Sequence, residues 1–126
     1  KDNAGRTPLH LAAMRGNTAV FKTLLEKISN VNVIDNRGWT PLMYASWGGH
    51  KDCADILLQK KAAAGVQDKS GWTALHWAVW AGHMDCIKLL LQFDANLKIK
   101  NHKNQTPMDL ANIKKVIDLF SNKEKK

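Results

Sequence analysis

The sequence predicts an all-α solenoid built from stacked helix–turn–helix units, and three periodic features support this prediction. A Thr followed by Pro or Ala and then by Leu or Met recurs with a constant period, at Thr7, Thr40, Thr73 and Thr106. An Asp or Asn lies five residues before each Thr, and a pair of leucines follows the first three at a constant distance, beginning at Leu24, Leu57 and Leu90. A single unit of this size cannot bury its own apolar face, so the units must stack and share one continuous core.

Each unit is expected to contain a turn, a helix, a second turn and a second helix. Asp followed by Gly three residues later is typical of a tight turn, because Asp bonds its own backbone and Gly accepts a positive φ. In the second copy, Thr40 can cap a helix over about 41–47, and the Pro after it loses no hydrogen bond at the first helical position. Gly49 can end that helix in the left-handed conformation, and a second helix is expected over about 51–60.

The repeated motif resembles that of the ankyrin-repeat family. Its full form, Asp-x-x-Gly-x-Thr-Pro-Leu-His-x-Ala, runs from Asp2 to Ala12. The resemblance covers essentially the whole chain and implies a slightly curved stack of helix pairs, with β-turn fingers projecting along one edge. It divides the single domain into repeats and a basic tail, over residues 2–34, 35–67, 68–100, 101–120 and 121–126.

Some positions depart from the family pattern. The family has Gly after the second helix, whereas this chain has Ile28, Lys61 and Asp94, so these helix ends are expected to be less well capped. The fourth copy lacks the Gly between its helices, and residues 112–120 are predicted to form an imperfect C-terminal cap before a frayed tail. The first copy has no specialised polar outer face, so we expect further repeats before Lys1 in a larger protein.

Composition narrows the class of protein further. The 126 residues include 19 Lys and Arg against 11 Asp and Glu, a net charge of +8 that favours acidic partners. Two cysteines exclude a disulfide scaffold and favour a reducing compartment, so an intracellular location, cytoplasmic or nuclear, is expected. No apolar run approaches the roughly 18 residues that a membrane span needs, so no membrane span is expected.

The resemblance implies a non-enzymatic scaffold that binds partners through its finger tips and the exposed side of its first helices. Four of the five tryptophans fall at such positions, in matched pairs one repeat apart: Trp39 with Trp72, and Trp47 with Trp80. The rings are expected to form a near-square exposed cluster that covers about 600–1000 Å². Tryptophan is also favoured at binding hot spots, so these four residues are the predicted apolar anchors.

The remaining predicted contact residues surround this cluster. They occupy the adaptable positions that the resemblance assigns to partner binding, and they are Arg6, Met14, Arg15, Arg37, Lys69 and Lys103. Their mostly cationic character predicts a protein or peptide partner that is acidic and carries apolar anchors. The function favoured by the sequence is therefore a protein–protein interaction module that recruits such a segment on its concave finger and first-helix face.

Three alternatives stay open at this point. The tryptophans could be structural packing between units rather than a binding surface, and Trp77 and Tyr44 are interpreted as core or groove filler. Tryptophan beside Lys or Arg would also suit a nucleotide or oligonucleotide sensor that stacks bases. The third alternative is an architectural spacer within a larger enzyme or channel.

Other reactive side chains receive structural interpretations. The resemblance implies that His10 and His76 bond to the Thr of their own motif, and that His50 caps the helix that follows it. Cys53 and Cys86 are one repeat apart, at about 8–10 Å, which is too far for a disulfide. No metal-ligand spacing, phosphate loop or cofactor motif is present, so no metal or cofactor is expected. Asn32 stands where some family members are hydroxylated, which makes it the one candidate modification site.

Overall fold

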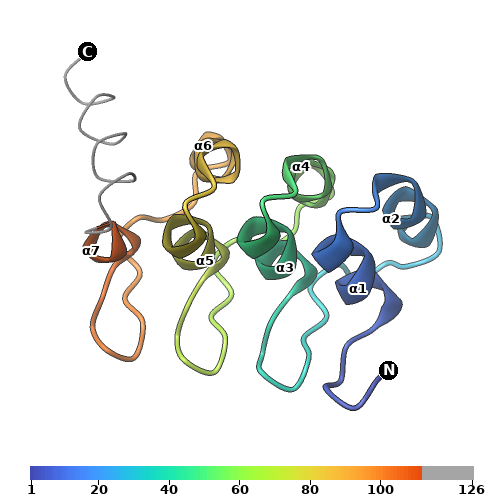
Figure 1. Cartoon of the computed structure of the whole chain (residues 1–126), viewed down its shortest axis with the longest axis horizontal. Coiled ribbons are helices and arrows are strands. Elements are labelled where there is room, and N and C mark those ends of the chain that lie inside the picture. Colours follow the sequence, from blue (N-terminus) through green and yellow to red (C-terminus); the bar gives the residue numbers. More distant parts are fainter. Residues whose placement is uncertain (112–126) are drawn as a thin grey trace.

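A computed structural model, which describes residues 1–111, contains an all-helical stack and confirms the predicted fold class. Figure 1 shows two rows of helices: the front helices α1, α3, α5 and α7 lie next to the projecting loops, and the back helices α2, α4 and α6 lie on the side away from the loops. The helices are α1 (Pro8–Arg15), α2 (Thr18–Leu25), α3 (Pro41–Gly48), α4 (Lys51–Gln59), α5 (Ala74–Ala81), α6 (Met84–Gln92) and α7 (Pro107–Leu110). The cap expected over 112–120 and the tail expected over 121–126 lie outside the described residues.

The front helices begin as the sequence predicts. Thr7, Thr40, Thr73 and Thr106 each accept a hydrogen bond through the hydroxyl from the backbone N–H three residues later. This bond satisfies one of the donors that the first helical turn leaves unpaired. The first helix of the second copy is one residue longer than expected, and its second helix ends one residue earlier.

Histidine in the motif joins the first unit to the second and the third unit to the fourth. The backbone N–H of Thr7 donates to Nδ1 of His10 at 3.0 Å, so the ring proton lies on Nε2, which donates to the carbonyl of Trp39 at 2.9 Å. His76 repeats both contacts, the second of them with the carbonyl of Gln105 at 2.9 Å. The second copy has Met43 at this position, so the junction of the second and third units lacks the corresponding bond.

The core runs through the stack as the repeat requires. Leu9, Leu42 and Leu75 occupy matched positions at the start of the front helices and are at most 1% exposed. Cys53 and Cys86 are buried free thiols on α4 and α6, as expected. Burial raises the pKa of Cys86 to about 11 and also raises that of Cys53, so both thiols stay protonated and pack as small apolar groups.

The projecting loops form β-turn fingers that are bonded to one another. In each finger the first residue accepts a backbone hydrogen bond from the residue three positions later, as Asp35 does from Gly38 at 3.0 Å. Neighbouring fingers are joined by backbone bonds, from Asn36 N–H to the Ala4 carbonyl at 2.9 Å and from Lys69 N–H to the Arg37 carbonyl at 3.0 Å. These bonds fix the fingers as a row along one edge of the stack (Figure 1).

The ends of the back helices correct one expectation. Lys61 and Asp94 adopt positive φ values of 65° and 62°, which places them in the left-handed region in spite of their side chains. The Ala62 N–H bonds the Leu57 carbonyl at 2.9 Å and the Lys61 N–H bonds the Leu58 carbonyl at 3.0 Å, a complete Schellman cap. These two caps are therefore formed, at the cost of backbone strain. Ile28 takes no such conformation, because α2 ends earlier, at Leu25.

We predict that Lys61→Gly stabilises the protein by about 0.5–1 kcal/mol. Gly removes the left-handed penalty of about 1–2 kcal/mol, and part of this gain is lost to the greater entropy of the unfolded chain. Lys60→Gly is the matched control and should lower stability, because Lys60 has a negative φ of −85° and carries no left-handed penalty to relieve. Urea unfolding measures both changes, and an unchanged or lower midpoint for Lys61→Gly would contradict the strain argument.

We also predict an acid-dependent loss of stability at the junction held by His76. Burial lowers the pKa of this imidazole below its usual value of about 6.5, so the unfolded chain binds the proton more tightly. The free energy of unfolding should therefore fall as pH drops below about 6.5, by at most about 1.4 kcal/mol per pH unit. Urea midpoints between pH 7.5 and 5.0 measure this slope. His76→Gln, which keeps a capping side chain, should be less stable at pH 7.5 but should show a shallower slope; an equal slope would rule out His76 as its source.

Candidate functional site

Two pockets lie on the inner face, between the fingers and the front helices. The N-terminal pocket has a volume of about 360 Å³ and is lined by Ala4, Arg6, Met14, Asp35, Arg37, Trp39, Tyr44, Trp47 and Trp77. The C-terminal pocket has a volume of about 550 Å³ and is lined by Lys69, Ser70, Trp72, Trp77, Trp80, His102, Lys103, Gln105 and Leu110. Together they contain every predicted contact residue except Arg15. The structure therefore brings most of the predicted surface together, in two hollows.

The two pockets share part of their lining pattern, although the N-terminal pocket reaches the fingers of the first and second units and the C-terminal pocket reaches those of the third and fourth. Five lining positions of the N-terminal pocket recur, one repeat later, in the C-terminal pocket. The matched pairs are Arg37 with Ser70, Trp39 with Trp72, Tyr44 with Trp77, Trp47 with Trp80, and Trp77 with Leu110. The pockets therefore follow from the repeat itself rather than from an irregular loop.

The aromatic side chains that line both pockets pack against one another. Trp47 meets Trp39 edge to face at 6.0 Å between ring centroids, and Trp80 meets Trp72 in the same way at 5.8 Å. Trp77 lies between the pairs, 4.4 Å from Trp39 and 4.3 Å from Trp72. The four predicted tryptophans thus form one connected cluster, but it is joined through a fifth ring.

Two of the four tryptophans in this cluster are exposed as expected, and the other two are not. Trp47 and Trp80 are 43% and 50% exposed, whereas Trp39 is buried at 7%. Trp72 is half-buried. Tyr44 and Trp77 cover Trp39 from neighbouring positions, at 4.7 Å and 4.4 Å between ring centroids, so Trp39 forms a wall and not a surface anchor.

Trp77 lines both pockets, although the sequence interpretation made it a filler of the core or groove. Its place between Trp39 and Trp72 agrees with a groove filler, and its spacing also puts it on the pocket-lining face. Trp77 is three residues before Trp80 on one helix, and residues three apart share a helix face. Tyr44, at the matched position one repeat earlier, is buried at 7% and agrees with the filler interpretation.

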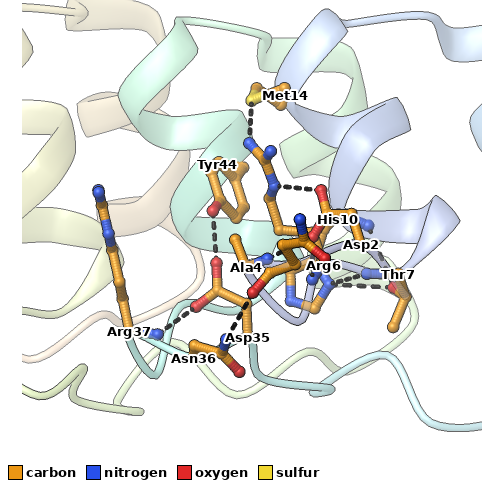
Figure 2. Close-up of polar contacts among 11 residues, drawn as sticks. Asp2, Ala4, Arg6, Thr7, His10, Met14, Asp35, Asn36, Arg37 and Tyr44 are labelled. Carbon is orange, nitrogen blue, oxygen red and sulfur yellow. Dashed lines mark hydrogen bonds and ion pairs between the residues drawn. The ribbon is translucent and has the colours of Figure 1, made fainter.

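Two buried carboxylates fasten the aromatic walls to the fingers. Tyr44 donates its hydroxyl to Oδ2 of Asp35, while Oδ1 of Asp35 accepts from the backbone N–H groups of Arg37 and Trp39 at 2.9 Å each (Figure 2). Trp77 donates its indole N–H to Oδ2 of Asp68 at 2.9 Å in the matched arrangement. Burial, followed by the bond to Asp35, raises the pKa of Tyr44, so the phenol remains a donor.

The predicted cations divide into three groups. Arg37, Lys69 and Lys103 are exposed and line the pockets as expected. Arg6 is half-buried and pairs with Asp2 at 2.8 Å, and its guanidinium also reaches Sδ of half-buried Met14 at 3.8 Å (Figure 2). Arg6 and Met14 are therefore a packed pair at the edge of the N-terminal pocket. The third group is Arg15 alone.

Arg15 does not line either of these two pockets. It lies instead beside a separate hollow at the N-terminal end of the stack, with Pro8, Leu11 and Val20 among the other lining residues. Arg15 is the last residue of α1, and the hollow it lines also includes Val20 and Leu24 of α2.

Two further side chains have structural partners. Asn32 Oδ1 accepts from the Ala63 backbone N–H at 2.9 Å, so the amide of this candidate modification site links consecutive back loops. His50 makes no side-chain cap, contrary to expectation; its Nε2 instead lies 2.9 Å from the Met14 carbonyl. Among residues 1–111, no three His, Cys, Asp or Glu side chains gather in a way that could hold a metal ion.

We predict that Tyr44→Phe lowers the free energy of unfolding by about 1–3 kcal/mol. The substitution removes only the hydroxyl and leaves Oδ2 of buried Asp35 without its donor. Trp80→Phe is the control on the same face, and because its ring is half exposed the change should stay near about 0.5 kcal/mol. Urea unfolding at pH 7.5 compares the two, and equal losses would show that the carboxylate does not depend on the phenol.

Comparisons with known proteins agree with this architecture. A family model described as ankyrin repeats in three copies matches residues 1–68, and one described as ankyrin repeats in many copies matches residues 49–91. No curated protein gives a significant match to the chain. Within the described part of the chain, every helix is too short or too polar to span a bilayer. Ankyrin repeats are generally protein–protein interaction modules and are typically non-enzymatic. With more than half of its length matched, the chain belongs to the ankyrin-repeat family.

Proposed function

We propose that this chain is a non-enzymatic interaction module that recruits an acidic peptide or protein segment with apolar anchors on its inner face. The observation that carries the proposal is the pair of matched pockets, each with one widely exposed tryptophan at its mouth. Trp47 serves the N-terminal pocket and Trp80 serves the C-terminal pocket.

The exposed rings are suited to act as anchors. Trp47 and Trp80 are 43% and 50% exposed, so each leaves a large apolar surface in contact with water in the free protein, which is unfavourable. Tryptophan is also among the residues most enriched at binding hot spots. Edge-to-face contacts with Trp39 and Trp72 hold Trp47 and Trp80 in place before a partner arrives. Such preorganisation reduces the entropy that binding must spend on ordering side chains.

The charge around the pockets favours an acidic partner. Arg37, Lys69 and Lys103 line them with exposed side chains. Asp35 is the one carboxylate among the described lining residues, and it is buried and fully engaged by Tyr44 and the finger backbone. Acidic groups on a partner would therefore meet cations without a competing carboxylate, which raises both specificity and the rate of association.

The experiment is a selection of random 12-residue peptides against the 126-residue chain, followed by calorimetry on the peptides recovered. We expect enrichment of aromatic or aliphatic residues flanked by Asp or Glu. Trp47→Ala and Trp80→Ala should each weaken binding by about 2–4 kcal/mol. Phe93→Ala is the matched control, because Phe93 is 40% exposed but lies at the end of α6, outside both pockets.

Charge reversal tests whether the partner is acidic. Lys69→Glu with Lys103→Glu should weaken the selected peptides and reduce their salt dependence, whereas Lys22→Glu on exposed α2 should not. Peptides that bind the Trp47 and Trp80 variants as tightly as the wild type would overturn the assignment of the surface. Tight, salt-dependent binding of a single-stranded 12-mer oligonucleotide, with no peptide recovered, would favour the nucleic-acid sensor instead.

A further inference from the structure

We propose that the acidic partner is a phosphorylated peptide, whose phosphoryl group is held at the tips of the second, third and fourth fingers. Arg37, Lys69 and Lys103 supply the positive charge there, and the hydroxyl of Ser70 lies among them. This inference rests on the proposed function, because it names the chemical group that the cations of the inner face recognise.

A third hollow lies between the two pockets described above. Its volume is about 270 Å³, and its lining includes Arg37 and Trp77 together with Lys69 and Ser70. Lys69 and Ser70 also line the C-terminal pocket, where Lys103 joins them. These two residues therefore stand at the boundary of two hollows, with Arg37 on one side and Lys103 on the other.

Backbone hydrogen bonds fix the finger tips beside one another. The N–H of Lys69 donates to the carbonyl of Arg37 at 3.0 Å, and the N–H of His102 donates to the carbonyl of Ser70 at 3.0 Å. Arg37, Ser70 and Lys103 also occupy the same position in three successive units. One exposed hydroxyl is therefore flanked by an exposed cation on each neighbouring finger.

The positive charges at this place are not neutralised by the chain itself. Among residues 1–111, the ion pair that forms is the one between Arg6 and Asp2 on the first finger. Asp68, the carboxylate in the middle hollow, is 6% exposed and has both oxygens engaged. Its Oδ1 accepts from backbone N–H groups of its own finger, and its Oδ2 accepts from the Trp77 indole at 2.9 Å. The exposed cations therefore remain available to a ligand.

A phosphoryl group matches these cations better than a carboxylate does. Phosphoserine carries a charge of about −1.5 to −2 at pH 7 and has three strong acceptor oxygens, whereas Asp or Glu carries one charge on two oxygens. The planar guanidinium of Arg37 can bind two phosphate oxygens at once. Lys69 and Lys103 add two point charges, and Ser70 adds a hydroxyl donor. Clusters of this kind are a recurring means of recognising phosphorylated peptides.

The extent of the charge favours a peptide over a nucleic acid or a membrane. The exposed cations that line the three hollows are Arg37, Lys69 and Lys103, all on neighbouring finger tips. They match a single dianion, whereas a nucleic acid carries a phosphate at every nucleotide and needs a longer basic track. The exposed rings of Trp47 and Trp80, in the pockets on either side, suit apolar side chains of the same peptide.

The test selects three libraries of 12-residue peptides in parallel against the 126-residue chain. The central residue is fixed as phosphoserine, Glu or Ser, and the other positions are random. Peptides recovered from the phosphoserine library are then remade with Glu or Ser at that place, and their affinities are measured by fluorescence anisotropy. We expect the phosphorylated form to bind at least about tenfold more tightly than the Glu form, because it has more charge and one more acceptor oxygen.

Variants of the chain assign the phosphoryl group to this place. Arg37→Gln and Lys103→Gln should each reduce the preference for phosphoserine over Glu, whereas Lys22→Gln on exposed α2 is the matched control and should leave it unchanged. Ser70→Asp puts a carboxylate among the cations and should abolish the preference. Each substituted side chain is exposed, so the urea midpoints of these variants should stay close to that of the wild type.

The outcomes separate this inference from the proposed function. Equal affinity for the phosphoserine and Glu forms, or a preference that persists in Ser70→Asp, would overturn the inference. The proposed function then stands if peptides from the Glu library still depend on Trp47 and Trp80. Displacement of the phosphopeptide by a single-stranded 12-mer oligonucleotide, or by phosphatidylcholine vesicles that contain a phosphoinositide, at a lower concentration than by the unlabelled phosphopeptide would also overturn the inference. If no library yields a peptide that binds, both proposals fail.

Discussion

No single unit of this chain can bury its own apolar face, and this constraint determines the architecture of the molecule. Each helix pair leaves part of its apolar surface exposed, and packing against the neighbouring pair buries that surface. Leu9, Leu42 and Leu75, at matched positions of successive front helices, are buried in this way. Once the units stack in register, any residue pattern that recurs from one unit to the next must also recur in space. The row of fingers, the buried carboxylates beneath the aromatic rings and the two pockets all follow from that single constraint.

Much of this architecture could be predicted from the sequence, because it depends on local rules. Only helix geometry and the period of the repeat are needed to predict the cap at Thr40, the left-handed Gly49 and the absence of a disulfide between Cys53 and Cys86. The caps at Lys61 and Asp94 were harder to foresee, because propensity argues against left-handed Lys and Asp. There the stacked back helices set the conformation, and the two residues accept the strain.

The binding surface was less predictable, because exposure depends on which ring covers which. Trp39 and Trp72 occupy the same position in successive repeats, yet Trp39 is buried and Trp72 is only half-buried. The difference lies in the following repeat, which supplies Trp77 against Trp39 but Leu110 at the matched place beyond Trp72. A periodic sequence therefore predicts the position of each side chain on the stack. The exposed fraction of that side chain depends on neighbouring residues that differ from one repeat to the next. Arg15 shows the same limit, since its position in the repeat did not reveal which end of the stack it would face.

The bond from His76 to the Gln105 carbonyl has a consequence for the larger pocket, which Gln105 helps to line. That bond positions the fourth finger, which carries Lys103, and it persists while the imidazole keeps its neutral form. Because burial depresses the pKa of the ring, this form survives a modest drop below neutrality that would charge a histidine in water. The desolvation that packs the repeats together thus keeps the ring neutral in the folded protein, and by the same shift it lowers the free energy of unfolding as the pH falls.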